Sequence, residues 1–248
     1  AKGIRMIAAL RARRIPVRYA TRLRRIEPTG GALLATLAVP RGLWTVEVDA
    51  VLMNDGFHPS NEILRLLGAA MDWDPRFRQL RPCRSADCET SVPGVFAVGD
   101  CCGLGGAPAA VAEGAIAGAA AARTVGRSST DPPAARAALS RARAFQDALW
   151  TLYAAPPPAF EDIPDEAILC RCEEVTAGAL RSALAAEPGD VGAAKRATRI
   201  GMGRCQGRYC GPALATLMAE RRGLAMDEFA FFAPRPPVKP VPVATILA

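Results

Sequence analysis

Apolar side chains in residues 2–14 recur at the three- and four-residue intervals of an amphipathic helix. They are Ile4, Ile7, Ala8 and Leu10. Beyond Pro16 the pattern changes to short apolar or alternating runs, which predict strands separated by turns at Gly30-Gly31 and Arg41-Gly42. The runs are 17–19, 23–26, 32–39, 44–48 and 51–53. The first part of the chain is therefore expected to be a strand-rich α/β piece that opens in mid-domain.

The middle of the chain has a further apolar run, Val95–Val98, which turn-forming residues bound on both sides and which predicts a strand. A glycine-rich loop separates it from a long alanine-rich helix expected from about Pro108 to Arg123. Pro132-Pro133 begin another helix, which the prolines at 156–158 end. Residues 234–248 are rich in proline and have almost no helical pattern.

Composition narrows the class of protein. The chain has 248 residues, of which 50% are hydrophobic, so two or more packed globular units are expected. No apolar run approaches the roughly 20 residues of a transmembrane helix, and we predict a cytoplasmic protein with no transmembrane segment. The net charge is +7, but the basic residues are spread along the chain and only 6% of residues are aromatic, which argues against nucleic-acid binding. The absence of an initiating Met suggests a C-terminal portion or a processed subunit.

Histidine chemistry is limited by the presence of a single histidine, His58. Sites built on two or more histidines are excluded, among them HExxH metallopeptidases and three-histidine zinc sites. His58 itself, in the sequence Gly-Phe-His-Pro, is interpreted as a loop histidine rather than a base. Cysteine is therefore the residue type in which to look for chemistry.

Four of the eight cysteines form two close pairs. One residue separates Cys170 from Cys172, and four separate Cys205 from Cys210. Without a secretory signal, such thiols are more often metal ligands than disulfides. Zinc sites usually have spacers of two to four residues, whereas Cys-x-Cys suits one iron of a cluster whose second iron takes the other pair. We predict that the four cysteines ligate a 2Fe-2S cluster, with structural zinc as the alternative.

The residues around these cysteines support the same prediction. Arginines beside the ligands would offset the negative charge of a thiolate-bound cluster, and glycines let the backbone approach the sulfurs. The arginines are Arg171, Arg204 and Arg208, and the glycines are Gly201, Gly203, Gly207 and Gly211. Through CRCEEVT and GMGRCQGRYCGP, residues 170–222 resemble the bacterioferritin-associated-ferredoxin type of 2Fe-2S domain. The longer spacing of the second pair is similar to that of a subgroup with RCQGR-x-CGP.

A second candidate site is the segment TSVPGVFAVGD, residues 90–100. An apolar strand that ends at a glycine would deliver Asp100 to a cleft, where its carboxylate could accept hydrogen bonds from sugar-like hydroxyls or cap the next helix. The segment resembles the second FAD-contacting segment of flavoproteins with two dinucleotide-binding domains. The resemblance implies that Gly99 and Asp100 contact FAD, Asp100 at the ribityl chain, and that the helix start at Ala109 and Ala110 lies beside the isoalloxazine ring.

No GxGxxG follows a predicted strand, so both pyrophosphate-binding loops are expected in an N-terminal half of the same subunit that this sequence does not include. The fold class expected is α/β, the C-terminal part of a flavoprotein with two dinucleotide-binding domains, plus a small helical 2Fe-2S domain. The expected divisions are the remainder of an NAD-type domain (1–57), the C-terminal part of an FAD-binding domain (58–127), a linker helix (128–165), the 2Fe-2S domain (166–225) and a proline-rich tail (226–248).

The other four cysteines receive structural interpretations. Cys83 and Cys88 are interpreted as inert thiols rather than a metal or redox pair. Cys101 and Cys102 adjoin the candidate flavin segment, but adjacent cysteines form strained disulfides, so simple packing is favoured.

Taken together, the flavin segment, the linker helix, the four-cysteine region and the terminal RPPVKPVPVATILA resemble the A or alpha subunit of heteromeric flavin dehydrogenases, such as opine oxidase, D-hydroxyproline dehydrogenase and hydrogen cyanide synthase. The resemblance implies an FAD and 2Fe-2S subunit that passes electrons from a flavoprotein partner subunit oxidising an amino or imino acid. It requires no catalytic acid, base or nucleophile in this chain. The tail 234–248 is expected to lie against a partner subunit or a neighbouring domain. The alternatives are a self-contained NAD(P)H-dependent flavin and iron-sulfur reductase and a zinc-stabilised interaction module.

Overall fold

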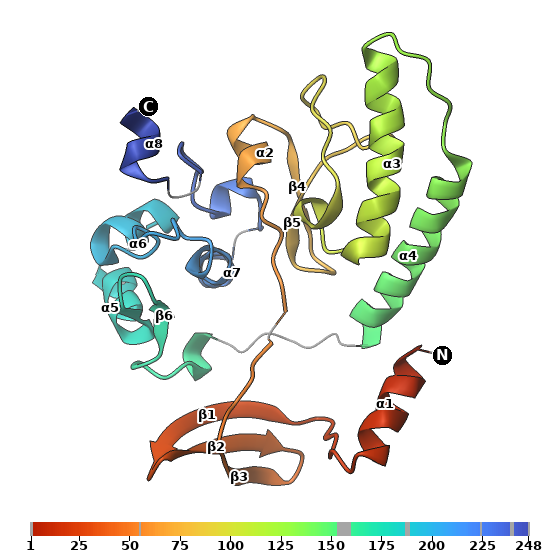
Figure 1. Cartoon of the computed structure of the whole chain (residues 1–248). Coiled ribbons are helices and arrows are strands. Elements are labelled where there is room, and N and C mark those ends of the chain that lie inside the picture. The colour runs from red at the N-terminus through yellow and green to blue at the C-terminus, as the bar shows by residue number, and fades with distance from the viewer. Residues whose placement is uncertain are drawn as a thin grey trace. The chain divides into compact units, whose positions relative to one another are not determined.

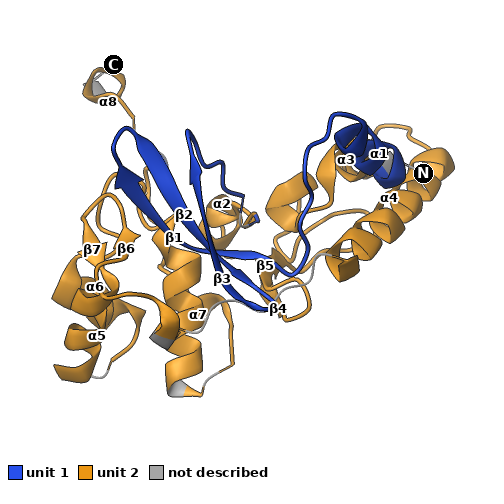
Figure 2. Cartoon of the chain, turned by 90° about the horizontal axis from the view of Figure 1, so that it is seen from below, with its two compact units in different colours: residues 1–56 blue, residues 57–248 orange. Residues whose placement is uncertain are grey.

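A helix and a three-stranded antiparallel sheet make up residues 1–56, the first of two units into which the chain divides (Figure 2). The computed structural model describes residues 2–54, 56–152, 160–186, 189–223, 225–238 and 241–247. The elements of the first unit are α1 (Lys2–Ala12), β1 (Arg22–Thr29), β2 (Ala32–Val39) and β3 (Gly42–Val48). The predicted helix and the predicted strands at 23–26, 32–39 and 44–48 are thus confirmed.

The turn between β1 and β2 requires its two glycines. Gly30 and Gly31 both have positive φ, +47° and +101°, as a two-residue hairpin turn requires at both central positions. The resulting register pairs Ala35 of β2 with Ile26 of β1 and Val46 of β3. Ala35 is also the one buried hydrophobic residue within the described part of this unit.

Three predicted strands are wrong. The runs 17–19 and 51–53 form no strand, because no neighbouring strand pairs with them in the described part of the first unit. In the second unit, Val95–Val98 makes one isolated bridge, from Phe96 to Glu89, instead of a ladder. The chain reverses at 91–94, and the backbone bonds of this extended segment go to Cys88, Thr90 and Val92 rather than to a neighbouring strand.

A small hairpin and two long helices form the first part of the second unit, residues 57–248. The elements are α2 (Glu62–Leu66), β4 (Met71–Asp74), β5 (Gln79–Pro82), the 3-10 turn η1 (Gly99–Cys102), α3 (Gly106–Thr124) and α4 (Pro133–Leu152). Helices α3 and α4 lie side by side (Figure 1), joined by a core of mostly small residues around Ile116 and Leu139. Both helices were predicted from the sequence and are confirmed, whereas the β4–β5 hairpin was missed.

Short helices surround the cysteine-bearing segments in the rest of this unit (Figure 1). The elements are η2 (Phe160–Asp162), β6 (Ile168–Cys170), β7 (Val175–Thr176), α5 (Ala177–Ala186), α6 (Val191–Thr198), α7 (Cys210–Arg222), η3 (Glu228–Ala230) and α8 (Val243–Leu247). Their core includes Leu180, Ile200 and Leu214, which are each at most 1% exposed, and it also takes in Cys170 and Cys210. The cysteines are therefore held by a packed interior rather than by a surface loop alone.

The C-terminal tail departs from the sequence prediction in one place. Val243–Leu247 form the short helix α8, where almost no helical pattern was expected. Its side chains Val243 and Ile246 are exposed. In the described ranges, no helix has both the length and the apolar character that crossing a membrane would require.

Candidate cofactor sites

Four thiols gather where β6 ends and α7 begins. Cys170 is the last residue of β6 and Cys210 the first of α7, and both are buried. Cys172, in the turn after β6, and Cys205, in the loop before α7, are partly exposed. Cys170 and Cys210 lie close enough to affect each other's ionisation, and so do Cys172 and Cys205. The structure therefore brings the two sequence pairs close to each other, and each pair of neighbours takes one cysteine from Cys170/Cys172 and one from Cys205/Cys210.

The surroundings of these thiols affect their protonation in opposite ways. Burial, together with the nearby Cys170 and Cys205, raises the pKa of Cys210 to about 12. Burial also opposes ionisation of Cys205, but hydrogen bonds from three backbone N–H groups of the following loop and from Cys172 outweigh it and lower the pKa of that thiol. Backbone donors directed at a sulfur are the groups that stabilise a thiolate bound to a metal or cluster.

Glycines make the close approach of the two cysteine segments possible. A Cβ atom at Gly203 would lie 2.2 Å from the Cβ of Cys172, so any side chain there would push the two segments apart. Gly201 and Gly207 have φ of +78° and +79°, a conformation that residues with a side chain rarely adopt. The loop 199–209 is thus specific to glycine at the positions nearest the thiols.

Side-chain hydrogen bonds hold the same loop in shape. Gln206 Nε2 donates to the carbonyls of Met202, at 3.2 Å, and Gly203, at 3.0 Å. Arg208 Nη1 donates to the carbonyl of Cys205 at 3.0 Å. Backbone bonds support the same carbonyls, since Gln206 N–H donates to Gly203 at 2.8 Å and Arg208 N–H donates to Cys205 at 3.2 Å.

This arrangement fits a two-iron cluster. All four thiols are free, and they lie near one another as two cross-pairs of neighbours. Four cysteine thiols with backbone N–H donors beside them match the ligand requirement of a 2Fe-2S cluster.

The candidate flavin segment places Asp100 at the start of α3. Asp100 is exposed, and its Oδ1 accepts hydrogen bonds from the backbone N–H groups of Gly105, at 3.1 Å, and Gly106, at 3.0 Å. The carboxylate therefore ties its loop to the start of the helix from outside, whereas the N-cap position that the sequence interpretation gave to Asp100 is occupied by Gly105. These bonds engage Oδ1 and leave Oδ2 as the atom through which Asp100 could meet a ligand hydroxyl.

The glycine before Asp100 sits tightly against the helix. A Cβ atom at Gly99, whose φ is +79°, would lie 3.4 Å from the Cβ of Ala110. Ala109 is buried in the core between α3 and α4, and a Cβ at Gly105 would lie 2.9 Å from its Cβ. Of the two alanines predicted to face a flavin, Ala109 thus packs inward, whereas Ala110 supports the loop that carries Gly99.

A buried carboxylate that the sequence analysis missed fixes this loop. Glu113, 5% exposed, is the single acidic residue of α3, and its Oε2 accepts the backbone N–H of Gly99 at 2.8 Å. Arg84 binds both carboxylate oxygens, at 3.1 and 3.2 Å, and Arg143 of α4 binds Oε1 at 3.1 Å. Arg84 also donates to the carbonyl of Ala97 at 2.7 Å. The sequence signal that could have revealed this role is the occurrence of one acidic residue in an otherwise alanine-rich helix.

Three of the four remaining cysteines lie in or beside cores. Cys88 is 2% exposed and packs against α3, whereas Cys83 is exposed. The Sγ atoms of Cys101 and Cys102 are 3.6 Å apart without a disulfide. The Cys102 hydrogen bond is the main influence that lowers the pKa of Cys101 to about 7, while the same contact and burial raise the pKa of Cys102.

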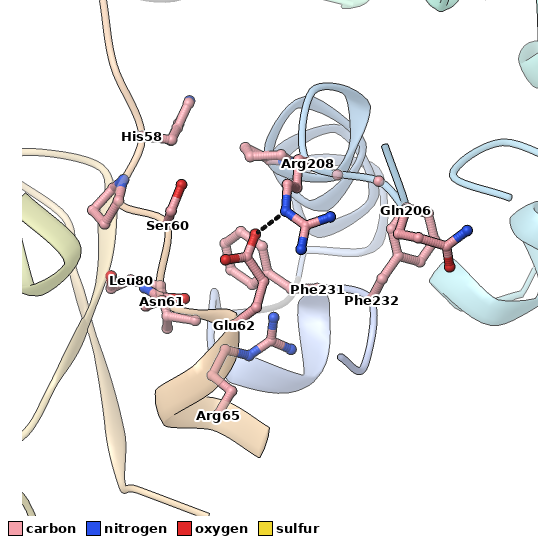
Figure 3. Close-up of a pocket in the computed structure, with 14 residues that line it drawn as sticks. His58, Ser60, Asn61, Glu62, Arg65, Leu80, Gln206, Arg208, Phe231 and Phe232 are labelled. Carbon is pink, nitrogen blue, oxygen red and sulfur yellow. Dashed lines mark hydrogen bonds and ion pairs between the residues drawn. The ribbon is translucent and has the colours of Figure 1, made fainter. Parts of the chain in front are cut away.

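A pocket of about 80 Å³ lies beside the cysteine loop (Figure 3). His58, Asn61, Glu62 and Arg65 line it from one end of the unit. The other walls are formed by Gln206, Arg208, Phe231 and Phe232. Asn61, 7% exposed, is fixed by its hydrogen bond to the Leu80 carbonyl at 2.8 Å. Burial, with the charge of Arg78, lowers the pKa of His58.

Comparison with known proteins adds two sequence families to this geometry. Residues 168–220 match the BFD-like [2Fe-2S] binding domain, and residues 3–114 match the pyridine nucleotide-disulphide oxidoreductase family. The first match includes all four gathered cysteines, and the second includes Gly99, Asp100 and Glu113. The matches indicate a 2Fe-2S cluster and FAD as cofactors.

Individual relatives agree with both matches. The A subunit of opine oxidase from Rhizobium meliloti (strain 1021) is 34% identical over 199 residues, which are 78% of this chain and 43% of that protein. The chain is a homologue of this opine oxidase component. Hydrogen cyanide synthase subunit HcnB of Pseudomonas protegens is 24% identical over 258 residues, 97% of this chain and 53% of that protein. The resemblance found in the sequence is thus confirmed.

Among solved structures, the L-proline dehydrogenase of P. horikoshii has a TM-score of 0.72 at 21% identity, over 100% of this chain and 48% of that one. This likeness supports the expected fold, the C-terminal part of a flavoprotein plus a small 2Fe-2S domain. The chain spans about half the length of the curated relatives it matches, the opine oxidase component included.

Removal of the Glu113 charge is expected to destabilise the second unit of this chain. In Glu113→Gln, Arg84 and Arg143 lose their shared carboxylate, and loss of one member of a buried pair costs about 3 kcal/mol or more. Thermal unfolding at pH 7 should show a lower midpoint. Asp131→Asn, which removes the exposed partner of Arg136, is the matched control and should change the midpoint much less.

The same variant has a predicted pH dependence. Burial opposes the ionisation of Glu113, but Arg84, the Gly99 N–H and Arg143 outweigh it and hold the pKa of Glu113 below its usual value of 4.5. A lowered folded-state pKa stabilises the fold fully above that value and progressively less as the pH falls below it. The stability difference between wild type and Glu113→Gln should therefore narrow below about pH 4.5. A constant difference down to pH 3 would contradict this account.

Proposed function

We propose that this chain is part of the electron-transfer subunit of a heteromeric dehydrogenase or oxidase that acts on an amino or imino acid such as an opine, hydroxyproline or glycine. The observation that carries the proposal is the occurrence, in one homologue of an opine oxidase component, of a four-thiol centre and a flavin-type segment. When bound, FAD supplies two-electron chemistry and the 2Fe-2S cluster one-electron chemistry. Their pairing suits the division of a hydride equivalent into single electrons.

The chain's own residues have binding and positioning roles in this proposal. Cys170, Cys172, Cys205 and Cys210 hold the irons, and the loop N–H groups stabilise the charge on the sulfurs. Asp100 binds a ribityl hydroxyl through the oxygen that is not bonded to the start of α3. Oxidation of the substrate belongs to a partner flavoprotein subunit, so that no side chain here transfers a proton to or from the substrate.

The partners are inferred from the relatives and from exposed surface. The names of the homologues describe subunits, which supports a heteromeric complex. The pyrophosphate-binding loops are expected in the part of these relatives that this chain does not span. Val243 and Ile246 of α8 are 70% and 68% exposed, and they give the tail apolar anchors for a partner subunit or a neighbouring domain.

The cluster assignment predicts the behaviour of Cys205→Ser. In the full subunit, purified anaerobically with its partners, the variant should lose most of the EPR signal of the reduced cluster, because one iron loses a ligand. FAD content should remain close to that of wild type. Cys83→Ser, which changes an exposed thiol, is the matched control and should leave the signal intact. An undiminished signal in Cys205→Ser would refute the assignment, and zinc without iron in wild type would favour the interaction-module alternative.

The FAD assignment predicts different effects for two variants of Asp100. Asp100→Asn keeps an acceptor for the N–H groups of Gly105 and Gly106 but removes the charge, whereas Asp100→Ala removes both. If Asp100 binds FAD, both variants should lower FAD occupancy, with a loss of about 1.5–3 kcal/mol for a hydrogen bond to a charged group. If both variants keep full FAD occupancy and only Asp100→Ala loses stability, the role of Asp100 is limited to its hydrogen bonds at the start of α3.

Substrate specificity separates the proposal from its enzyme alternative. The complex should be bleached by an amino or imino acid substrate, whereas the full subunit by itself should respond slowly to NAD(P)H. Rapid bleaching of the isolated full subunit by NAD(P)H would instead favour a self-contained reductase.

A further inference from the structure

A short segment after α7 contacts both the cysteine loop and the β4–β5 region. It consists of η3 and the consecutive residues Phe231 and Phe232. Asp227 Oδ1 fixes its start by accepting hydrogen bonds from the backbone N–H groups of Phe229, at 2.9 Å, and Ala230, at 3.1 Å. The side chains of Phe231 and Phe232 therefore extend from adjacent positions of a backbone segment whose conformation is fixed.

Phe232 covers the glycines of the cysteine loop. A Cβ atom at Gly201 would lie 2.3 Å from Cε2 of its ring, and one at Gly207 would lie 2.3 Å from Cδ2. At Gly211, next to Cys210, the corresponding distance is 3.5 Å. The ring thus lies directly against bare backbone on both sides of Cys205, and it also packs against the core that contains the buried thiols.

Phe231 contacts the other part of the unit. The centroid of the Phe231 ring lies 6.1 Å from that of Trp73 on β4. The Arg65 guanidinium of α2 lies 5.7 Å from the same Phe231 centroid. Arg65 Nη2 also donates to the Glu228 carbonyl at 3.1 Å. In Figure 3 the Phe232 ring lies beside Gln206, whereas Phe231 lies on the side of the pocket toward Glu62 and Arg65.

An ion pair adds a second connection between the same two regions. Arg208 Nε lies 3.5 Å from Glu62 Oε1 (Figure 3), and the same side chain donates to the Cys205 carbonyl. Both groups of this pair are about one quarter exposed, so water partly screens it. The connection therefore combines aromatic contacts with a partly screened ion pair.

We propose that Phe231 and Phe232 form a clasp that sets the properties of the cluster and its distance from the flavin segment. Phe232 excludes water from the loop that carries Cys205, and Phe231 fixes that loop against the β4–β5 region. The inference rests on the proposed function, since it requires a cluster at these thiols. Neither phenylalanine is a ligand, so both are positioning residues.

The effect of Phe232 is expected on the reduction potential. The reduced cluster carries one more negative charge than the oxidised one, and water admitted to the loop stabilises the more highly charged form. In the full subunit, Phe232→Ala should favour reduction about tenfold, which for one electron is a rise of about 59 mV. Phe229→Ala, two residues before the clasp and 83% exposed, is the matched control and should keep the wild-type potential.

A second variant tests the proposal if Phe232→Ala fails to fold. Phe232→Leu keeps an apolar cover with less area, so its potential should lie above that of wild type and below the value expected for the fully opened loop. A potential equal to wild type in either folded, cluster-containing Phe232 variant would overturn the role of Phe232.

Phe231 should affect transfer rather than potential. In Phe231→Ala, the cluster potential should match wild type, while hydrogen exchange of the amides at 71–82 rises and flavin-to-cluster electron transfer in single turnover slows at least threefold. If hydrogen exchange at 71–82 and the rate of flavin-to-cluster electron transfer both match wild type in Phe231→Ala, the proposed clasp is refuted. A wild-type subunit without a 2Fe-2S signal would refute the proposed function instead, so the two failures are distinguishable.

Discussion

The cysteine loop can follow its path only because several of its residues lack a side chain. Gly203 approaches Cys172 more closely than any Cβ allows, and Gly201 and Gly207 lie under the ring of Phe232. The same absence of side chains exposes backbone N–H groups to Cys205. A methyl group at Gly203 would clash with Cys172, and one at Gly201 or Gly207 would clash with the Phe232 ring, so the approach of the cysteines and the attachment of the C-terminal segment both depend on glycine.

The flavin segment meets a similar requirement by electrostatics. Gly99 has positive φ and no strand ladder to hold it, so its position depends on the hydrogen bond that it donates to Glu113. That carboxylate is tolerated inside the unit because Arg84 and Arg143 neutralise it. The residue in the recognisable motif is Asp100, but the residue that places the motif is fourteen positions beyond Gly99, in the middle of a helix.

Sequence patterns predicted the features that depend on residues close together in the chain. Spacing located the helices α1, α3 and α4, and the cysteine motif located four thiols that do lie together. Contacts between distant residues were invisible to such reasoning. Val95–Val98 has the composition of a strand but lacks a partner for a ladder, and the hairpin β4–β5 is formed from the polar-interrupted sequence around Trp73. The cross-pairing of the thiols likewise depends on a loop conformation rather than on their spacing.

The segment at 228–232 shows why this limit matters for function. Its two phenylalanines look like an ordinary apolar pair before a proline-rich tail, and nothing in their own sequence indicates that one ring lies on the loop of Cys205 and the other beside Trp73. One-electron transfer between two cofactors requires a fixed separation, which neither cofactor site supplies by itself. In the clasp that we propose, Phe231 and Phe232 supply it, because they lie far from the flavin motif in sequence yet contact β4 and the cysteine loop. The motifs therefore identify the redox groups, while the proposed coupling of those groups depends on contacts made by residues far from the motifs in sequence.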